Sequence, residues 1–399
     1  MGLLKIIFII FILSFPLAEL GRFQFPNGIA FSVNEVILAV LIVFWGIYKI
    51  TKNKKVKKSI ILKPSSIFVC IAFFSLILNF FNLSLDKFLI SFLYLLRWVS
   101  YLLLFFIVRD FDINYKKKIP YFMLFSGGMV VLGGYVQYFL YPSLRNLYYL
   151  GWDEHLYRMF SSFLDPNFLG SFLVLLLMLI LGLLYKQFKV KNVYLGVILS
   201  AFGFVTLIAV YLTYSRGALI MLIVSLASFL FLIGKRKIIM VSILALILII
   251  FFIPKSFKTE GTNFLRTASS EARISSVQIA FKIFQTSPVY GIGFNAYRYA
   301  QNKYGLDNNG WMVTHSGAGT DNSFIFVLAT TGIIGFASFI YLVISVFMLA
   351  KKNLKNNFLS LVLFSSFAGL AVNSLFINSL FYVFILEWIW IVGGLIESN

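Results

Sequence analysis

Long apolar stretches with few charges divide this chain of 399 residues. Each is long enough, or nearly so, to cross a bilayer hydrocarbon core of about 30 Å. Hydrophobic residues make up 60% of the chain and charged residues 12%, against about 25% charged in a soluble domain, so an ordinary water-soluble enzyme is excluded. We predict an all-α multi-pass membrane protein, a single integral membrane domain over residues 1–399, with about twelve transmembrane helices at 4–20, 28–48, 60–80, 88–108, 119–141, 167–185, 193–213, 217–233, 238–254, 321–349, 357–375 and 379–396.

The first stretch has an alternative interpretation as a cleaved signal peptide. Lys5 precedes an apolar core, and Ala18 is a small residue near its end. The stretch has no clear small-x-small cleavage site, however. We therefore favour a retained first helix.

The formal net charge of +20 raises nucleic acid as a partner, but membrane topology explains it better. Most of the 34 basic residues lie in short connections that would all face one side of the membrane. Because short cytoplasmic loops carry an excess of Lys and Arg, we expect both termini to be cytoplasmic and no nucleic-acid binding. Cys70 is the only cysteine, so no intramolecular disulfide can form.

Two connections on the opposite, external side stand out. Residues 142–166 form a short loop rich in aromatic and polar groups, and residues 255–320, between the ninth and tenth spans, form a large loop. Long loops in compact proteins are usually functional, so we expect the chemistry on the external face.

The large loop is predicted to contain an amphipathic helix. Ser270 is placed to cap a helix from Glu271 to about Thr286, and Pro288 ends it. Helical spacing predicts an apolar face made of Ile274, Val277, Ala280, Phe281 and Phe284.

Two external arginines are candidate phosphate ligands. Arg216 lies at the external junction of the seventh and eighth spans, where its donors would add to unpaired backbone amides at a helix N-terminus. Arg273 lies in the first turn of the loop helix. The alternatives are an arginine that reaches the membrane interface and a solvated surface arginine.

Three polar positions flank the predicted spans. Asp321 begins the tenth span and could cap it together with Asn322, which is compatible with catalysis. Asp165 opens the sixth span beside Pro166, most simply as a helix start. His315 lies in a glycine-rich stretch, where a histidine is usually a surface residue.

Charged residues within the predicted membrane region are costly, so they should pair or line a polar cavity. Arg97 could pair with Glu35 or Glu387 as architecture, or supply positive potential to a lipid-diphosphate cavity.

Other catalytic motifs are missing from the sequence. Asp110-Phe111-Asp112 resembles the metal-binding pair of nucleotide-sugar glycosyltransferases, but it falls on the predicted cytoplasmic face, where a solvated loop is the simpler interpretation. The external acids show no convincing metal cluster, and we expect neither a metal nor a cofactor.

Four motifs, taken together, resemble the O-antigen ligase and O-antigen polymerase superfamily of bacterial envelope glycosyltransferases. Their order matches around one large external loop, over about residues 160–340. The remaining spans agree only in number and hydropathy. The motifs are FLDPNFLGSFL, YSRGALI, EARISSVQIAFKIFQTSPVYGIGFNAY and TDNSFIFVLATTGIIGFASF.

The resemblance implies transfer of a polyprenyl-diphosphate-linked oligosaccharide on the external face of the bacterial plasma membrane. Arg216 and Arg273 would hold the diphosphate and Asp321 would act as the catalytic base or orient the acceptor. Further expected substrate-binding residues are Arg97, Asp165, Asn167, Tyr214, Asn322 and His315. Donor and acceptor are both lipid-linked, and a chain-length regulator is a candidate partner.

Ligase-like members carry a histidine before the Asn-Ser-Phe element, where this sequence has Asp321. This departure favours a polysaccharide polymerase of O-antigen or capsule type over a ligase, in which His315 would substitute as base. A transporter for the same lipid-linked substrates is a third interpretation. The large loop bearing Arg273 argues against it, since transport does not require such a loop.

Overall fold

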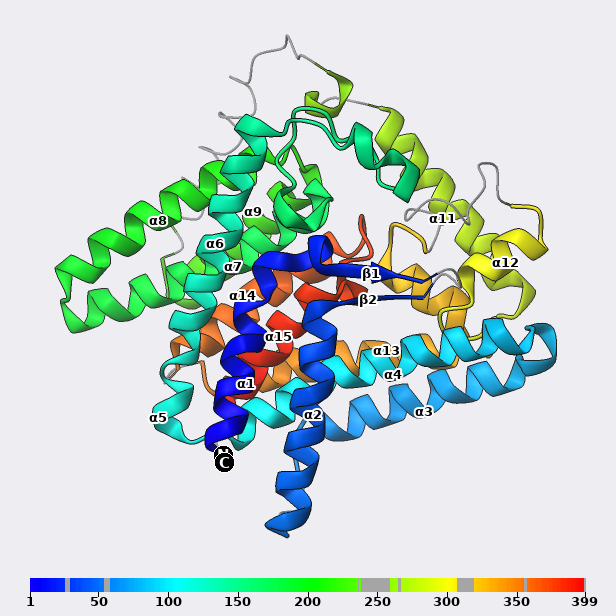
Figure 1. The fold of residues 1–399 in the computed structure, drawn as a ribbon, viewed down its shortest axis with the longest axis horizontal. Coiled ribbons are helices and arrows are strands. Elements are labelled where there is room, and N and C mark those ends of the chain that lie inside the picture. The colour runs from blue at the N-terminus through cyan, green and yellow to red at the C-terminus, as the bar shows by residue number, and fades with distance from the viewer. Residues whose placement is uncertain are drawn as a thin grey trace.

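The computed structural model describes residues 1–25, 29–53, 58–235, 237, 259–264, 267–306, 319–354 and 357–397. The fold is mostly helical (Figure 1). Its α-helices are α1 (Gly2–Leu13), α2 (Val33–Thr51), α3 (Leu62–Leu78), α4 (Leu85–Asp110), α5 (Ile113–Lys116), α6 (Ile119–Leu140), α7 (Pro166–Val190), α8 (Val193–Leu212), α9 (Arg216–Leu232), α11 (Ala268–Thr286), α12 (Tyr297–Lys303), α13 (Ser323–Lys352), α14 (Phe358–Asn373) and α15 (Val383–Ile396).

One small sheet departs from the predicted all-α fold. Strands β1 (Arg22–Gln24) and β2 (Ala30–Ser32) pair antiparallel between α1 and α2. Short 3-10 segments connect other elements: η1 (Phe15–Gly21), η2 (Phe80–Asn82), η3 (Arg145–Leu150), η4 (Ser161–Phe163), η5 (Glu260–Thr262) and η7 (Ser379–Phe381). The hairpin matters here because it brings β2 to the cavity described below.

Six helical segments of the described chain are long and apolar enough to cross a membrane, and α1 with η1, bent by 64°, would make a seventh. Helices α3, α9, α14 and α15 are apolar but shorter. The prediction of a multi-pass helical membrane protein is therefore confirmed. The count of twelve spans stays a prediction, because four of the helices at predicted positions are short and the stretch 238–254 lies outside the described residues.

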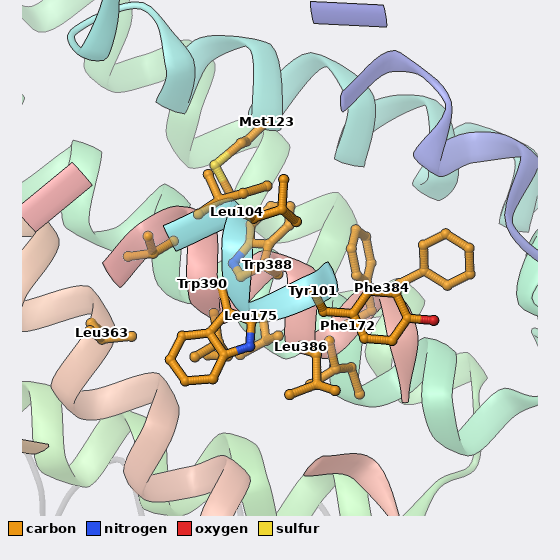
Figure 2. Packing of buried hydrophobic residues seen from close by; sticks show 14 of the residues in the cluster. Tyr101, Leu104, Met123, Phe172, Leu175, Leu363, Phe384, Leu386, Trp388 and Trp390 are labelled. Carbon is orange, nitrogen blue, oxygen red and sulfur yellow. The ribbon is translucent and has the colours of Figure 1, made fainter. Parts of the chain in front are cut away.

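Helices α7 and α15 form the centre of the packing. Every residue of α15 from Phe384 to Ile396 is buried, as expected of a helix that is apolar on all sides. Figure 2 shows Trp388 and Trp390 of α15 among side chains from neighbouring helices. In this core the rings of Phe172 and Trp388 meet edge to face, with centroids 5.1 Å apart.

The two ends of the described chain lie at the same end of the molecule (Figure 1). Lys5 forms an ion pair with Asp112, and Arg109 pairs with Glu397 at 3.0 Å. Both pairs attach a chain end to the segment around α5. This arrangement agrees with termini on one side of a membrane; which side stays a prediction.

Helix α13 is broken at Gly332, which has φ 66° and ψ −171°. The turn-rich segment 288–293 lies beside the break. Ile333 N donates to Pro288 O at 2.9 Å, and Gly293 N donates to Thr330 O at 3.0 Å. A Cβ atom on Gly332 would lie 2.2 Å from Val289 O, so only glycine fits at this crossing. The crossing joins the end of α11 to the middle of α13.

The loop helix differs from the prediction at its start. Helix α11 begins at Ala268 after Thr267, so Ser270 lies within the first turn and is not the cap. The predicted apolar face is also partly wrong. Ala280 and Ile283 are buried in the contact with α13, whereas Ile274 and Phe281 are 59% and 49% exposed. Helical spacing alone did not indicate which side of the helix would meet α13.

Candidate functional site

A cavity of about 670 Å³ is lined by residues of several elements. They are the β-hairpin, the start of α2, α4, the 142–166 loop, the start of α7, α11, the start of α12 with the residues before it, the start of α13, and the segment that leads into α15. Its size falls in the range of roughly 300–1,000 Å³ typical of ligand pockets. Charged and titratable groups are its main feature: Glu19, Arg22, Glu35, Arg97, Asp153, His155, Arg158, Asp165, Arg273, Arg298 and Asp321. This cavity is the candidate functional site.

Asp321 lines this cavity directly before α13. Asn322 is the N-cap of α13, and its side-chain oxygen accepts from Phe324 N at 2.9 Å and Ile325 N at 3.0 Å. The Asp321 backbone is held by α11, because its N–H donates to Ser276 Oγ at 3.2 Å. Among the residues that the structure describes, no hydrogen bond to the Asp321 carboxylate is found. The Asp321 carboxylate is therefore not used to cap α13.

The surroundings of Asp321 raise the pKa of its carboxyl above the ordinary value of 3.8. Desolvation by the cavity walls is the main cause, and the negative charges of Asp165 and Asp153 add to it, while Arg273 opposes the shift. The side chain is nonetheless exposed by its accessible surface. It is a carboxylate that water can reach inside a protein-walled cavity.

The two candidate phosphate ligands lie close together, on different helices. Arg273 lines the cavity from the second turn of α11. Arg216 is the first residue of α9, is half-buried, and donates from Nη2 to Ser270 Oγ of α11 at 3.0 Å. The two guanidinium charges are near enough to act on each other. Arg216 is not part of the cavity lining itself.

Asp165 and Asn167 connect the start of α7 with its neighbours. Asp165 is the N-cap of α7, accepting from Asn167 N at 2.6 Å, and its other oxygen lies 3.9 Å from His155 Nε2. Asn167 Oδ1 accepts from Arg158 Nη2 at 3.3 Å and from Ser215 Oγ at 3.1 Å. Both line the cavity, and their contacts are explained by local architecture.

Tyr214 precedes α9 but does not line the cavity. Its backbone is left-handed, with φ 49°, and its ring centroid lies 5.3 Å from that of Phe264 and 5.7 Å from that of Tyr211. Burial in this aromatic group raises the pKa of Tyr214 to about 12. Tyr214 therefore belongs to an aromatic group outside the lining of the cavity that contains Asp321 and Arg273.

Of the two acids considered for Arg97, the structure pairs it with Glu35. Arg97 Nε donates to Glu35 Oε1 at 2.7 Å, and the Tyr101 hydroxyl donates to the same oxygen. Glu35 Oε2 accepts from Ser32 N at 2.8 Å in a capping box at the start of α2. Arg97 lines the cavity as one member of an ion pair, so its charge is largely offset.

Glu387, the other acid considered, is fully buried in α15. In the amide orientation that satisfies its neighbours, Asn34 donates to both Glu387 oxygens at 2.7 and 2.9 Å and accepts from Ser14 Oγ. These contacts join α15 to α2 behind the cavity.

Some predicted positions fall elsewhere. His315 lies outside the described residues. Asp110 accepts from Trp45 Nε1 at 2.9 Å and pairs with Lys49 at 2.6 Å, and Asp112 caps α5. Both acids therefore have structural partners. Within the described ranges, no three His, Cys, Asp or Glu side chains gather as a metal ion would require.

Several cavity residues carry no role in the sequence prediction. Arg298 and Asn295 line the cavity from the segment that follows the glycine-rich turn. At another wall, the rings of Phe168 and Tyr382 stack 4.1 Å apart. The sequence feature that could have indicated Arg298 and Asn295 was their polarity directly after a turn in the loop predicted to be external. Tyr382, in an apolar stretch, gave no such signal.

The fold and the site define a class: a multi-pass membrane protein with a charged cavity at the helix ends, built around a loop helix and the start of α13. The family model described as O-antigen ligase matches residues 201–340. The resemblance to the O-antigen ligase and polymerase superfamily is thereby confirmed over this segment, which includes Arg216, Arg273 and Asp321. Among curated proteins, no match to the chain is found.

Proposed function

We propose that this protein polymerises polyprenyl-diphosphate-linked oligosaccharide repeat units on the external face of the bacterial plasma membrane. The observation that carries the proposal is the position of Asp321: its carboxylate faces the same cavity as Arg273, while Asn322 caps α13. The family match supports glycan transfer of the ligase or polymerase type. The aspartate in place of a histidine favours the polymerase.

The donor diphosphate would bind beside Arg216 and Arg273. Two guanidinium groups close to each other repel unless an anion lies between them. Arginine forks match phosphate oxygens bidentately. A diphosphate would therefore satisfy both groups, and the hydrogen bond from Arg216 to Ser270 fixes the distance between α9 and α11.

The reaction would be a direct displacement at the anomeric carbon of the donor sugar. The acceptor hydroxyl oxygen forms the new glycosidic bond as the bond from the anomeric carbon to the phosphate oxygen breaks. The polyprenyl diphosphate leaves with the bonding electron pair, and its developing charge is stabilised by Arg216 and Arg273. The hydroxyl proton passes to the carboxylate of Asp321.

The environment of Asp321 suits this proton transfer. A raised pKa makes the carboxylate a better base than an ordinary aspartate. Asp165 is less suited to the role, because one of its oxygens caps α7.

The test uses the purified full-length chain in detergent with a lipid-linked repeat unit as both donor and acceptor. A ladder of elongated lipid-linked products is the expected result. Detergent leaves no second compartment, so elongation would also exclude a pure transporter. In cells, deletion should leave single-repeat glycolipids; full-length polymer that only fails to reach its final acceptor would contradict the polymerase and indicate a ligase.

A further inference from the structure

Arg298 is a half-buried cation of the cavity wall without a role in the proposed transfer. Two other cavity arginines have acidic partners: Arg22 pairs with Glu19 at 3.2 Å and Arg97 with Glu35 at 2.5 Å. For Arg298, no hydrogen bond or ion pair with another described residue is found. A partly desolvated guanidinium that faces a cavity in this way is suited to an anionic ligand.

Two neighbours extend this wall. Asn295, three residues earlier, also lines the cavity, with its backbone in the left-handed region at φ 58°, where asparagine is tolerated better than most residues. Tyr94 of α4 lines the cavity as well. Lys87 of α4 lies over the Tyr299 ring of α12, with its Nζ 5.5 Å from the ring centroid, so α4 and α12 meet near this wall. We call Tyr94, Asn295 and Arg298 the α12 wall.

We propose that the α12 wall binds an acidic sugar of the repeat unit, with the sugar carboxylate on Arg298. The chemistry of the three side chains fits such a ligand. A guanidinium accommodates a carboxylate in two parallel hydrogen bonds, and an asparagine amide can donate to and accept from sugar hydroxyls. The Arg97 guanidinium lies over the Tyr94 ring, 4.7 Å from its centroid, so the contribution of Tyr94 is its hydroxyl, which can both donate and accept. The α12 wall can therefore recognise both the carboxylate and the hydroxyl groups of an acidic sugar.

This inference rests on the proposed function for one premise, that the ligand is a glycan. It adds the substrate class, a repeat unit that contains an acidic sugar. The diphosphate is assigned to the α9 and α11 arginines, whereas Arg298 belongs to α12. A cavity of about 670 Å³ has room for groups beyond the reacting sugar. An uncharged repeat unit would leave Arg298 partly desolvated and without an ionic partner among the described residues, which is unfavourable.

The direct test is saturation-transfer-difference NMR of the purified full-length protein in detergent with sodium glucuronate, glucose and methyl phosphate as separate probes. We expect a clear signal for glucuronate and little for glucose. Arg298→Gln should reduce the glucuronate signal several-fold, and Arg298→Lys should restore part of it. Lys303→Gln is the matched control, because Lys303 is an exposed cation of the same helix outside the cavity; it should leave the signal unchanged.

Two results would overturn the inference: a glucuronate signal that survives Arg298→Gln in a folded protein, or a signal only for methyl phosphate that depends on Arg298. Chemical analysis of the polysaccharide from the source cells is an independent check. An acidic sugar in the repeat unit is expected, and a wholly neutral repeat unit would contradict the inference. Since the NMR readout needs no turnover, loss of the proposed polymerase activity would not produce the same outcome.

Discussion

Asn322 accepts the two backbone N–H groups at the start of α13, and Asp321, its direct neighbour, faces the cavity. The cap and the candidate base are therefore two separate residues. A change at one can be tested without removing the function of the other, and this separation makes the role of Asp321 accessible to experiment.

Asp321→Asn should abolish polymer formation without unfolding the protein. An amide accepts no proton near neutral pH, so the proposed base is lost while the size of the side chain is kept. Asn322, expected from the sequence to bind substrate, does not line the cavity and caps α13. Asn322→Ala is therefore the matched control: it should cost about 1 kcal/mol of stability through the lost cap and retain activity. Polymerisation at equal membrane abundance is the measurement. We expect His315→Ala to lose much less; a dead His315→Ala beside an active Asp321→Asn would reverse the assignment.

The stability of the protein should respond to the charge on Asp321. Its pKa is raised in the folded state, so the folded protein binds this proton more tightly than the unfolded chain does. Stability should fall as the pH rises through the window between the ordinary value and the raised one. Asp321→Asn should therefore keep or increase the melting temperature at pH 7, and the difference from the parent should vanish in acid. A lower melting temperature at pH 7 would contradict the assigned environment.

The pH dependence of activity should also depend on the ionisation of Asp321. If the Asp321 carboxylate is the base, turnover needs its ionised form and falls when the pH drops through its pKa. The midpoint should lie above the ordinary aspartate value of 3.8. Arg273→Gln should shift the midpoint further up, because Arg273 is the group that favours the ionised form. A downward shift would refute the described charge relationship.

Arg216→Lys should lower activity sharply with normal expression. Lysine keeps the charge but loses the planar fork, and hydrogen bonds to charged groups contribute about 1.5–3 kcal/mol, or roughly 10- to 100-fold in rate. Arg273→Ala should have a similar effect with weaker donor binding. Arg145→Lys serves as the control, since Arg145 is exposed on η3. Near-normal polymer length and yield from Arg216→Lys would rule out bidentate diphosphate binding.

Arg97 should prove to be mainly architectural. Removal of one partner of a buried ion pair leaves the other charge uncompensated, at a cost on the order of 3 kcal/mol. Arg97→Gln should therefore destabilise the protein strongly, and the double variant Arg97→Gln with Glu35→Gln should recover much of the loss. Melting temperatures of the three proteins are compared. A stable but inactive double variant would instead support a role for Arg97 in substrate binding.

Gly332→Ala should disrupt the crossing between α13 and segment 288–293. The backbone of Gly332 has a conformation that side chains disfavour by about 1–3 kcal/mol, and the added Cβ would clash with Val289 O. We expect a lower melting temperature and reduced activity, since the crossing connects α11 to α13. Gly46→Ala in α2 is the control, because a Cβ there meets no atom within 4 Å.

The sequence alone determined the features that depend on local composition. Apolar runs and the placement of basic residues predicted a multi-pass helical membrane protein, because the bilayer requires long apolar helices whatever their packing. The motif residues around Arg216, Arg273 and Asp321 indicated the family for a similar reason: they lie in short segments whose order can be read directly.

Tertiary structure decided which residues share the cavity and what each contacts. The sequence could not choose between Glu35 and Glu387 as the partner of Arg97, because both lie far from it along the chain and only helix packing brings one within reach. Nor could it show that α11 would meet α13 through Ala280 and Ile283. Arg298 was overlooked for the same physical reason. The role of an arginine in a long loop can be assigned only when the folded chain shows whether the side chain faces solvent, an acid or a cavity.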